Sequence, residues 1–158
     1  MGIEKIVSGG QTGADRAGLD WALANGVPHE GWCPRGRRAE DGEIAPSYRL
    51  RETPERNYLV RTEWNVRDSD ATAIFSLAAN LGGGSLATLR FAERLGRPCL
   101  HLSRSASEDP AAQLREFVEE HRVRALNIAG PRASGAPEIA EFVMEVLDAA
   151  FEGRGESA

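Results

Sequence analysis

The sequence predicts an α/β protein with a Rossmann-like three-layer sandwich, in which a mainly parallel sheet carries helices on both faces. Short apolar runs alternate with segments of helical length along the chain, and several of those segments have recognisable caps. The length of 158 residues with 41% hydrophobic residues is enough to bury a proper core. We therefore expect one ligand-binding domain over residues 1–151 and a polar tail over residues 152–158.

The first half of the chain begins with an apolar strand over 3–8 and a helix over 14–25, which Gly26 stops. A short extended piece is expected over 29–33. Residues 34–56 show no clear period of 2 or 3.6, and a helix is expected over 58–68.

The second half alternates more regularly. A buried strand over 71–77 precedes a helix over 85–95 that ends at Gly96, and a strand follows over 98–103. Asp109 and Pro110 give an N-cap and a first-turn proline to a helix over 111–121. The last strand is expected over 124–129 and the last helix over 137–151.

Composition excludes several classes of protein. The net charge of -5 argues against a general nucleic-acid binder, which normally has a basic surface. No apolar stretch is long enough to span a bilayer, and residues 1–8 lack the pattern of a signal peptide. Two widely spaced cysteines, Cys33 and Cys99, form no disulfide framework, so we expect a cytoplasmic protein without a membrane partner.

The first expected strand leads into a glycine-rich turn and then a helix, which is the layout of a phosphate-binding loop. Glycines allow a close approach of a ligand to the backbone, and the first amides of a helix attract anions. Neither a Walker lysine nor the dinucleotide fingerprint is present, and a purely structural turn stays open as the alternative. The candidate ligands of a phosphate here are Ser8, Gly9, Gly10, Gln11, Thr12, Gly13, Asp15 and Arg16.

A second glycine-rich turn follows the buried strand at 71–77. In parallel sheets the loops after strands meet at one edge, so the two turns are expected to lie together. A flexible connection is the alternative interpretation. The candidate residues are Gly82, Gly83, Gly84, Ser85 and Thr88.

The helix over 58–68 places Arg61, Asn65 and Asp68 on one face. A cation, an amide and a carboxylate suit a polar heterocycle, a ribose and a phosphate. A solvated helix surface with one ion pair is the other interpretation.

Residues 34–56 are too long for an ordinary connection. Arg35, Arg37 and Arg38 either form a lid that closes over an anion or belong to a surface loop paired with its own carboxylates. His29, Cys33, Cys99 and His101 match no zinc spacing, so no metal site is predicted.

Four segments carry a resemblance to a known family. They read SGGQTGADRA (8–17), GWCPRGRRAEDG (31–42), RTEWNVRDSD (61–70) and GGGSLAT (82–88). In this order they resemble the family named putative molybdenum cofactor carrier proteins, the circularly permuted YpsA-like branch of the SLOG superfamily, over nearly the whole chain. The resemblance implies a Rossmann-like fold, a homodimer or homotetramer, and a nucleotide-like or pterin-phosphate ligand at the glycine-rich turns. It also implies that molybdenum, where present, arrives on the pterin as molybdenum cofactor (molybdopterin).

Enzyme and binding protein are the rival classes. Related SLOG enzymes are phosphoribohydrolases, whose signature places a glutamate shortly after a Gly-Gly-x-Gly-Thr turn. Here that stretch reads GGGSLATLR and lacks the carboxylate, and Asp15 or Asp68 is the remaining candidate to replace it in cleaving an N-glycosidic bond. We assign no catalytic residue and favour binding without turnover, with a phosphoribohydrolase or a sensor of a nucleotide-derived signal as alternatives.

Overall fold

The central layer of the protein is a five-stranded sheet. The structure of the protein is a computed structural model that describes residues 2–151. The predicted tail at 152–158 therefore lies outside the described residues. The five strands are β1 (Lys5–Val7), β2 (His29–Glu30), β7 (Ala71–Ser76), β8 (Cys99–Ser103) and β9 (Ala125–Ala129). They lie in the order β2-β1-β9-β7-β8, and every neighbouring pair is parallel.

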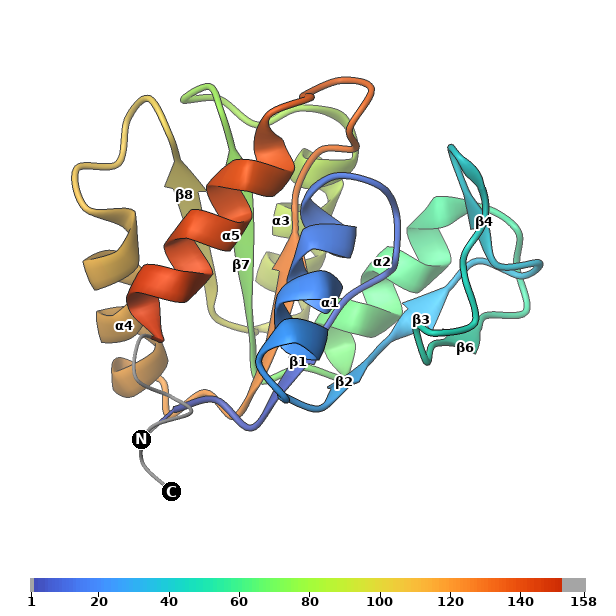
Figure 1. The fold of residues 1–158 in the computed structure, drawn as a ribbon, viewed down its shortest axis with the longest axis horizontal. Helices are drawn as coiled ribbons and strands as arrows, with labels where there is room; N and C mark the ends of the chain where they lie inside the picture. The colour runs from blue at the N-terminus through green and yellow to red at the C-terminus, as the bar shows by residue number, and fades with distance from the viewer. Residues whose placement is uncertain (1, 152–158) are drawn as a thin grey trace.

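Helices cover both faces of this sheet. The helices are α1 (Ala14–Ala24), α2 (Tyr58–Arg67), α3 (Gly83–Leu95), α4 (Pro110–Glu120) and α5 (Ile139–Ala150). Helix α5 packs against α1 and α4 on one face, and α2 packs against α3 on the other (Figure 1). The predicted Rossmann-like three-layer arrangement is therefore confirmed.

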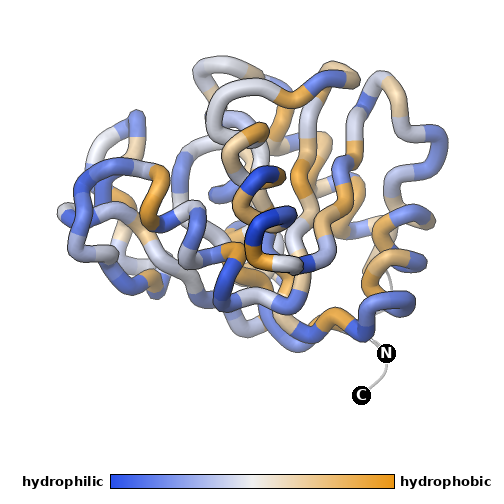
Figure 2. Tube along the Cα trace, turned by 180° about the vertical axis from the view of Figure 1, so that it is seen from behind, coloured by the Kyte–Doolittle hydropathy of each residue, from blue (hydrophilic) through white to orange (hydrophobic). Residues whose placement is uncertain are grey.

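The core lies between the sheet and the helix layer that contains α5. Every residue of β7 is buried, as expected for a strand covered on both faces. Helix α5 buries Ile139, Phe142, Val143 and Val146 at helical spacing, and the Phe142 ring meets Phe75 of β7 edge to face at 5.8 Å. Figure 2 shows the hydrophobic residues gathered along the central strands.

The expected extended piece at 29–33 divides into two strands. Residues His29–Glu30 join the main sheet as β2, whereas Trp32–Cys33 form β3 and pair with β6 (Arg51–Glu52) outside it. The break falls at Gly31, where a Cβ atom would lie 1.9 Å from the carbonyl oxygen of Ser8. Only glycine fits this approach, so the chain can turn away from the sheet here.

Residues 34–56, which we call the strap, contain three short strands. They include a short antiparallel pair, β4 (Arg38–Ala39) with β5 (Gly42–Glu43), and then β6. The strap projects to one side of the sheet beside α2 (Figure 1) and is mostly hydrophilic (Figure 2). Its buried Ile44 packs over Gly10 of the first glycine-rich turn.

Most other expected elements agree with the structure to within two residues. The helix expected at 85–95 begins at Gly83 because the Gly82 carbonyl already accepts hydrogen bonds from the amides of Ser85 and Leu86. Within residues 2–151 no helix is long and apolar enough to cross a bilayer.

Candidate functional site

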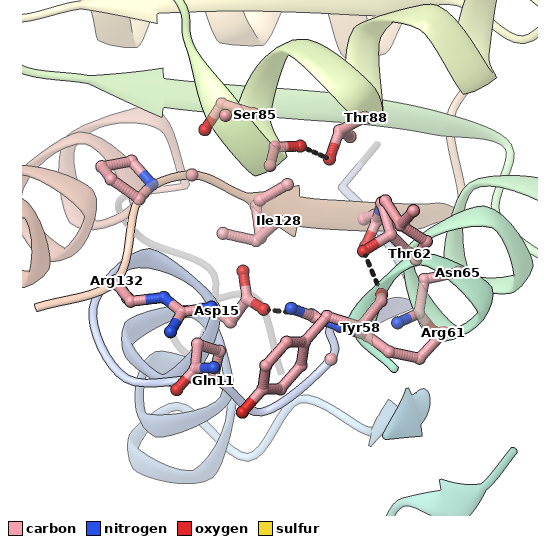
Figure 3. Close-up of a pocket in the computed structure, with 18 of the residues that line it drawn as sticks. Gln11, Asp15, Tyr58, Arg61, Thr62, Asn65, Ser85, Thr88, Ile128 and Arg132 are labelled. Atoms are coloured by element: carbon pink, nitrogen blue, oxygen red, sulfur yellow. Dashed lines mark hydrogen bonds and ion pairs between the residues drawn. The ribbon is translucent and has the colours of Figure 1, made fainter. Parts of the chain in front are cut away.

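A cavity of about 280 Å³ opens at the carboxyl edge of the sheet, where β1 and β9 end and α3 begins (Figure 3). This is the edge at which open parallel sheets bind ligands. The lining residues come from the turn after β1, from α2, from the start of α3 and from the end of β9 with its following loop. They are Gly9, Gln11, Asp15, Tyr58, Leu59, Arg61, Thr62, Asn65, Gly82, Gly83, Gly84, Ser85, Thr88, Asn127, Ile128, Ala129, Gly130, Pro131, Arg132 and Gly135.

The two glycine-rich turns thus meet at one cavity, as the sequence led us to expect. Of the sixteen predicted ligand residues, ten line it. Those outside it are Ser8, Gly10, Thr12, Gly13, Arg16 and Asp68.

The start of α1 is already occupied by the protein's own acceptors. The Ala14 amide donates to the Pro131 carbonyl at 3.2 Å, and the Arg16 amide donates to the Gln11 carbonyl at 3.0 Å. The expectation that the first turn of α1 offers free amides is therefore wrong for the amides of Ala14 and Arg16. Gly10 lies under the strap, with φ +78°, and a Cβ atom there would meet Leu50 at 2.7 Å.

The start of α3 is open instead. No acceptor among residues 2–151 is bonded to the amides of Gly83 and Gly84, and a Cβ atom built at either position meets nothing within 4 Å. Ser85 is buried beside them, and the Thr88 hydroxyl donates to the Gly84 carbonyl at 2.9 Å. Free amides at the positive end of a helix dipole are a ready site for an anion.

Gln11 supplies a buried donor to the cavity. Its Oε1 accepts from the amides of Thr12 at 3.0 Å and Glu40 at 2.8 Å, which fixes the orientation of the side-chain amide. Its Nε2 is buried and has no partner among the described residues. A buried polar atom without a partner is costly, so an acceptor on a ligand would relieve it.

Asp15 and Arg61 form a buried ion pair in the wall of the cavity, with Oδ2 and Nη1 2.6 Å apart (Figure 3). Burial raises the pKa of the Asp15 carboxyl, and the adjacent Arg61 guanidinium opposes that rise. The pair depends on Gly9, because a Cβ atom there would lie 2.0 Å from Nη1 of Arg61.

Arg132 brings a second cation to the cavity. Its guanidinium lies 5.0 Å from the centroid of the Tyr58 ring, which the guanidiniums of Arg38 and Arg61 also approach, at 5.1 and 5.6 Å. Arg132 forms no ion pair with the described acidic residues. It is therefore free to meet an anionic ligand.

The predicted face of α2 carries out two different tasks. Asn65 lines the cavity, but both ends of its amide are used by the Trp32 backbone, at 2.8 and 2.9 Å. Asp68 accepts from the Trp32 indole at 2.8 Å and from Arg67, and this Arg67 bond lowers its pKa. Asn65 and Asp68 therefore hold β3 against α2. Arg61 is the residue of this face that brings a charged group to the cavity wall.

The arginines of the strap do not form a simple lid over the cavity. The Arg37 guanidinium donates to backbone carbonyls within the strap, including Ala45 and Tyr48 at 2.8 Å. Arg38 donates to the Arg56 carbonyl, and Arg35 is exposed. In this structure Arg37 organises the strap, so it is not free to close over an anion.

Sequence reasoning missed Tyr58 and the loop from Gly130 to Gly135. Arg132 is the first cation after the expected strand at 124–129, and the rule that loops after parallel strands form the site applies to it as well. The sequence therefore contained a signal for Arg132, because the loop at 130–135 follows a strand of the parallel sheet in the same way as the two glycine-rich turns do.

No cluster of three metal-ligating side chains occurs within the described part of the chain. Cys33 and Cys99 are free thiols, and burial raises the pKa of both, that of Cys99 to about 11. A thiol with a raised pKa is a poor metal ligand at neutral pH.

A parallel sheet with a donor-rich cavity at its carboxyl edge defines a Rossmann-like α/β protein of the ligand-binding type. The chain belongs to the circularly permutated YpsA SLOG family, whose model matches residues 6–151.

A solved structure named "Putative molybdenum carrier protein", from Syntrophus aciditrophicus, is 45% identical in sequence. Its TM-score to this chain is 0.91, and the match covers 94% of each chain. A structure of (E)-4-hydroxy-3-methyl-but-2-enyl diphosphate reductase is 13% identical with a TM-score of 0.39, over 93% of this chain and 59% of that one, and is too remote to inform function. A comparison with curated proteins found no match.

Proposed function

We propose that this protein binds a small phosphate-bearing molecule, nucleotide-like or pterin, in the cavity at the start of α3. The observation that carries the proposal is the excess of unused donors there. The amides of Gly83 and Gly84, Nε2 of Gln11 and the Arg132 guanidinium have no acceptor or acidic partner among residues 2–151. Such a set suits phosphate oxygens.

The size of the cavity favours a small ligand. Pockets for small molecules span roughly 300–1,000 Å³, so about 280 Å³ is near the lower end. The phosphate would lie at Gly83 and Gly84, and the rest of the ligand would extend toward Tyr58 and Ile128. Tyr58 offers an aromatic face to a heterocycle.

Binding is favoured over hydrolysis of an N-glycosidic bond. Asp15 is the one carboxylate among the described lining residues, and Arg61 holds it at 2.6 Å. Asp68, the other carboxylate that the sequence offered, lies outside the cavity and bonds to Trp32. A carboxylate tied in an ion pair is a poor base, so a carrier or sensor role fits the geometry better.

Molybdenum cofactor, the ligand that the family resemblance implies, also suits this cavity in part. Molybdenum cofactor carries a phosphate, which the donors at Gly83, Gly84 and Arg132 would hold. No His, Cys or Glu occurs among the described lining residues, so molybdenum would keep the ligands that its pterin supplies.

The sharpest test places a charge at the start of α3. Gly84 has no positive φ and nothing within 4 Å of a Cβ atom, so Gly84→Asp preserves the fold and even favours the helix by about 0.3–1 kcal/mol. We expect this variant to weaken binding of adenosine 5′-monophosphate and inorganic phosphate at least tenfold by isothermal titration calorimetry. The isosteric control Gly84→Asn should stay within threefold of the wild type.

Two results would overturn the proposal: binding of neither probe by the wild type, or equal binding by the Asp and Asn variants. Native mass spectrometry of protein purified from its own host then identifies the ligand. A pterin-phosphate mass supports the carrier role, and a nucleotide mass supports the sensor.

We also propose a cytoplasmic location and assembly into a homodimer or homotetramer. The free thiols of Cys33 and Cys99 support the location, since a reducing compartment keeps thiols unpaired. Light scattering after size-exclusion chromatography tests the assembly, and a monomer at micromolar concentration would contradict it.

A further inference from the structure

One carboxylate of the strap is bonded both to the turn after β1 and to the loop after β9, the two segments that carry Gln11 and Arg132 of the cavity wall. Oε2 of Glu40 accepts from the Thr12 hydroxyl and, at 3.0 Å, from the Ser134 amide, while Oε1 accepts from the Ser134 hydroxyl at 2.5 Å. Glu40 itself does not line the cavity. Its carboxylate bonds to Thr12 and Ser134, which lie outside the lining but are next in sequence to the lining residues Gln11 and Gly135.

The first of these contacts concerns Gln11. The Glu40 amide donates to Oε1 of Gln11 at 2.8 Å, together with the neighbouring amide of Thr12. With both donors on the oxygen, Nε2 has no partner within the described chain and lies in the buried wall. The backbone amide of Glu40 therefore helps to set where Gln11 directs its free donor, and the Glu40 carboxylate anchors this part of the strap to Thr12 and Ser134.

The second contact concerns the loop that carries Arg132. Thr12 accepts from the Ala133 amide at 3.1 Å and donates its hydroxyl proton to Glu40, which in turn binds Ser134 at two atoms. Arg132 directly precedes these two anchored residues. Its exposed side chain packs over the Tyr58 ring.

We infer that Glu40 is a positioning residue of the cavity, which orients the Gln11 donor and the Arg132 loop toward an acceptor-rich anionic ligand. This inference rests on the proposed function. It assigns to the strap the task of fixing the cavity wall, in place of direct contact with the anion.

The electrostatics of Glu40 agree with this role. The Ser134 and Thr12 hydroxyls lower the pKa of its carboxyl, so Glu40 is ionised at neutral pH and accepts every one of these hydrogen bonds. Its neighbour Asp41 pairs with Arg16 at 2.5 Å and contacts neither Gln11 nor the loop at 131–135. Asp41→Ala is thus a matched control within the same turn of the strap.

The first test needs no ligand. Hydrogen exchange followed by NMR should show the Ser134 and Ala133 amides exchanging at least tenfold faster in Glu40→Ala than in the wild type. In Asp41→Ala the same amides should stay within threefold of the wild-type rate. Equal protection in wild type and Glu40→Ala would overturn the inference.

The second test is a double-mutant cycle with adenosine 5′-monophosphate as the probe. Glu40→Ala should weaken binding about tenfold in the wild type and threefold or less in an Arg132→Ala background, because part of its effect acts through Arg132. Equal tenfold losses in both backgrounds would mean that Glu40 does not act through the loop. Failure of the wild type to bind the probe or phosphate contradicts the proposed function instead, and the exchange rates still decide whether Glu40 fixes the loop.

Discussion

Asp15 of α1 and Arg61 of α2 are joined by a 2.6 Å ion pair although their helices belong to opposite layers of the protein. The Arg61 side chain passes over Gly9, at the end of β1, where a side chain would block it. The pair therefore connects the two helical layers around the edge of the sheet.

Removing one partner of this pair should be costly. Both side chains are largely buried, with 6% and 12% exposed, so Arg61→Ala leaves an unpaired buried carboxylate. We expect the free energy of unfolding to fall by about 3–5 kcal/mol in urea titrations. Arg94→Ala, which breaks the exposed pair with Glu63, is the control and should cost no more than about 1 kcal/mol. Similar losses in the two variants would show that the Asp15–Arg61 pair is not a buried contact in solution.

Gly9→Ala should disturb the same pair without touching either charge. The added methyl group would lie 2.0 Å from Nη1 of Arg61 and displace it. Crowding of this kind typically costs about 1–3 kcal/mol, measurable by thermal or urea unfolding. Gly84→Ala, which adds a methyl group in open space, should leave stability unchanged or slightly higher. Wild-type stability for Gly9→Ala would contradict the close approach.

Asn65 and Asp68 should differ in their effect on stability. Asn65→Ala leaves the partly buried amide and carbonyl of Trp32 without their side-chain partners, which we expect to cost about 2–3 kcal/mol. Asp68→Ala removes an exposed bond to the Trp32 indole and an exposed ion pair with Arg67, and should cost about 1 kcal/mol or less. Urea unfolding followed by tryptophan fluorescence measures both. A larger loss of stability in Asp68→Ala than in Asn65→Ala would show that Asn65 does not stabilise the fold, and its side chain would then be available to a ligand.

Docking of the strap should weaken in acid. Hydrogen bonds from Ser134 and Thr12 lower the pKa of Glu40 from its usual 4.5, and hydrogen bonding to Arg16 lowers that of Asp41 from 3.8. A carboxyl whose folded pKa is lowered stabilises the fold above its unfolded pKa and loses that contribution as the pH falls toward the folded value. The wild type should thus exceed Glu40→Gln in stability at pH 7, and the difference should shrink as the pH falls below about 4.5. A stability difference between wild type and Glu40→Gln that does not change with pH would contradict this effect of the Glu40 carboxylate.

The sequence alone was sufficient for the layers of the fold and for the meeting of the two glycine-rich turns. Strand and helix periods are local, and the carboxyl ends of parallel strands share an edge, so Gln11 and Gly83 were predicted at one cavity. The pairing of Asn65 with Trp32 was not predictable, because it depends on how β3 leaves the sheet at Gly31. Arg37 likewise resembled an anion ligand until the path of the strap showed carbonyl groups around it.

The position of β9 has a consequence for how the molecule is made. Although it is the last strand within residues 2–151, it lies between β1 and β7 and provides the pairing partners of both. Until residues 125–129 leave the ribosome, β1–β2 and β7–β8 are two separate ribbons that share no strand. The loop with Arg132 follows even later in the sequence, so the cavity wall is complete only after the sheet has closed through these non-local pairings, a class of contact that typically forms slowly.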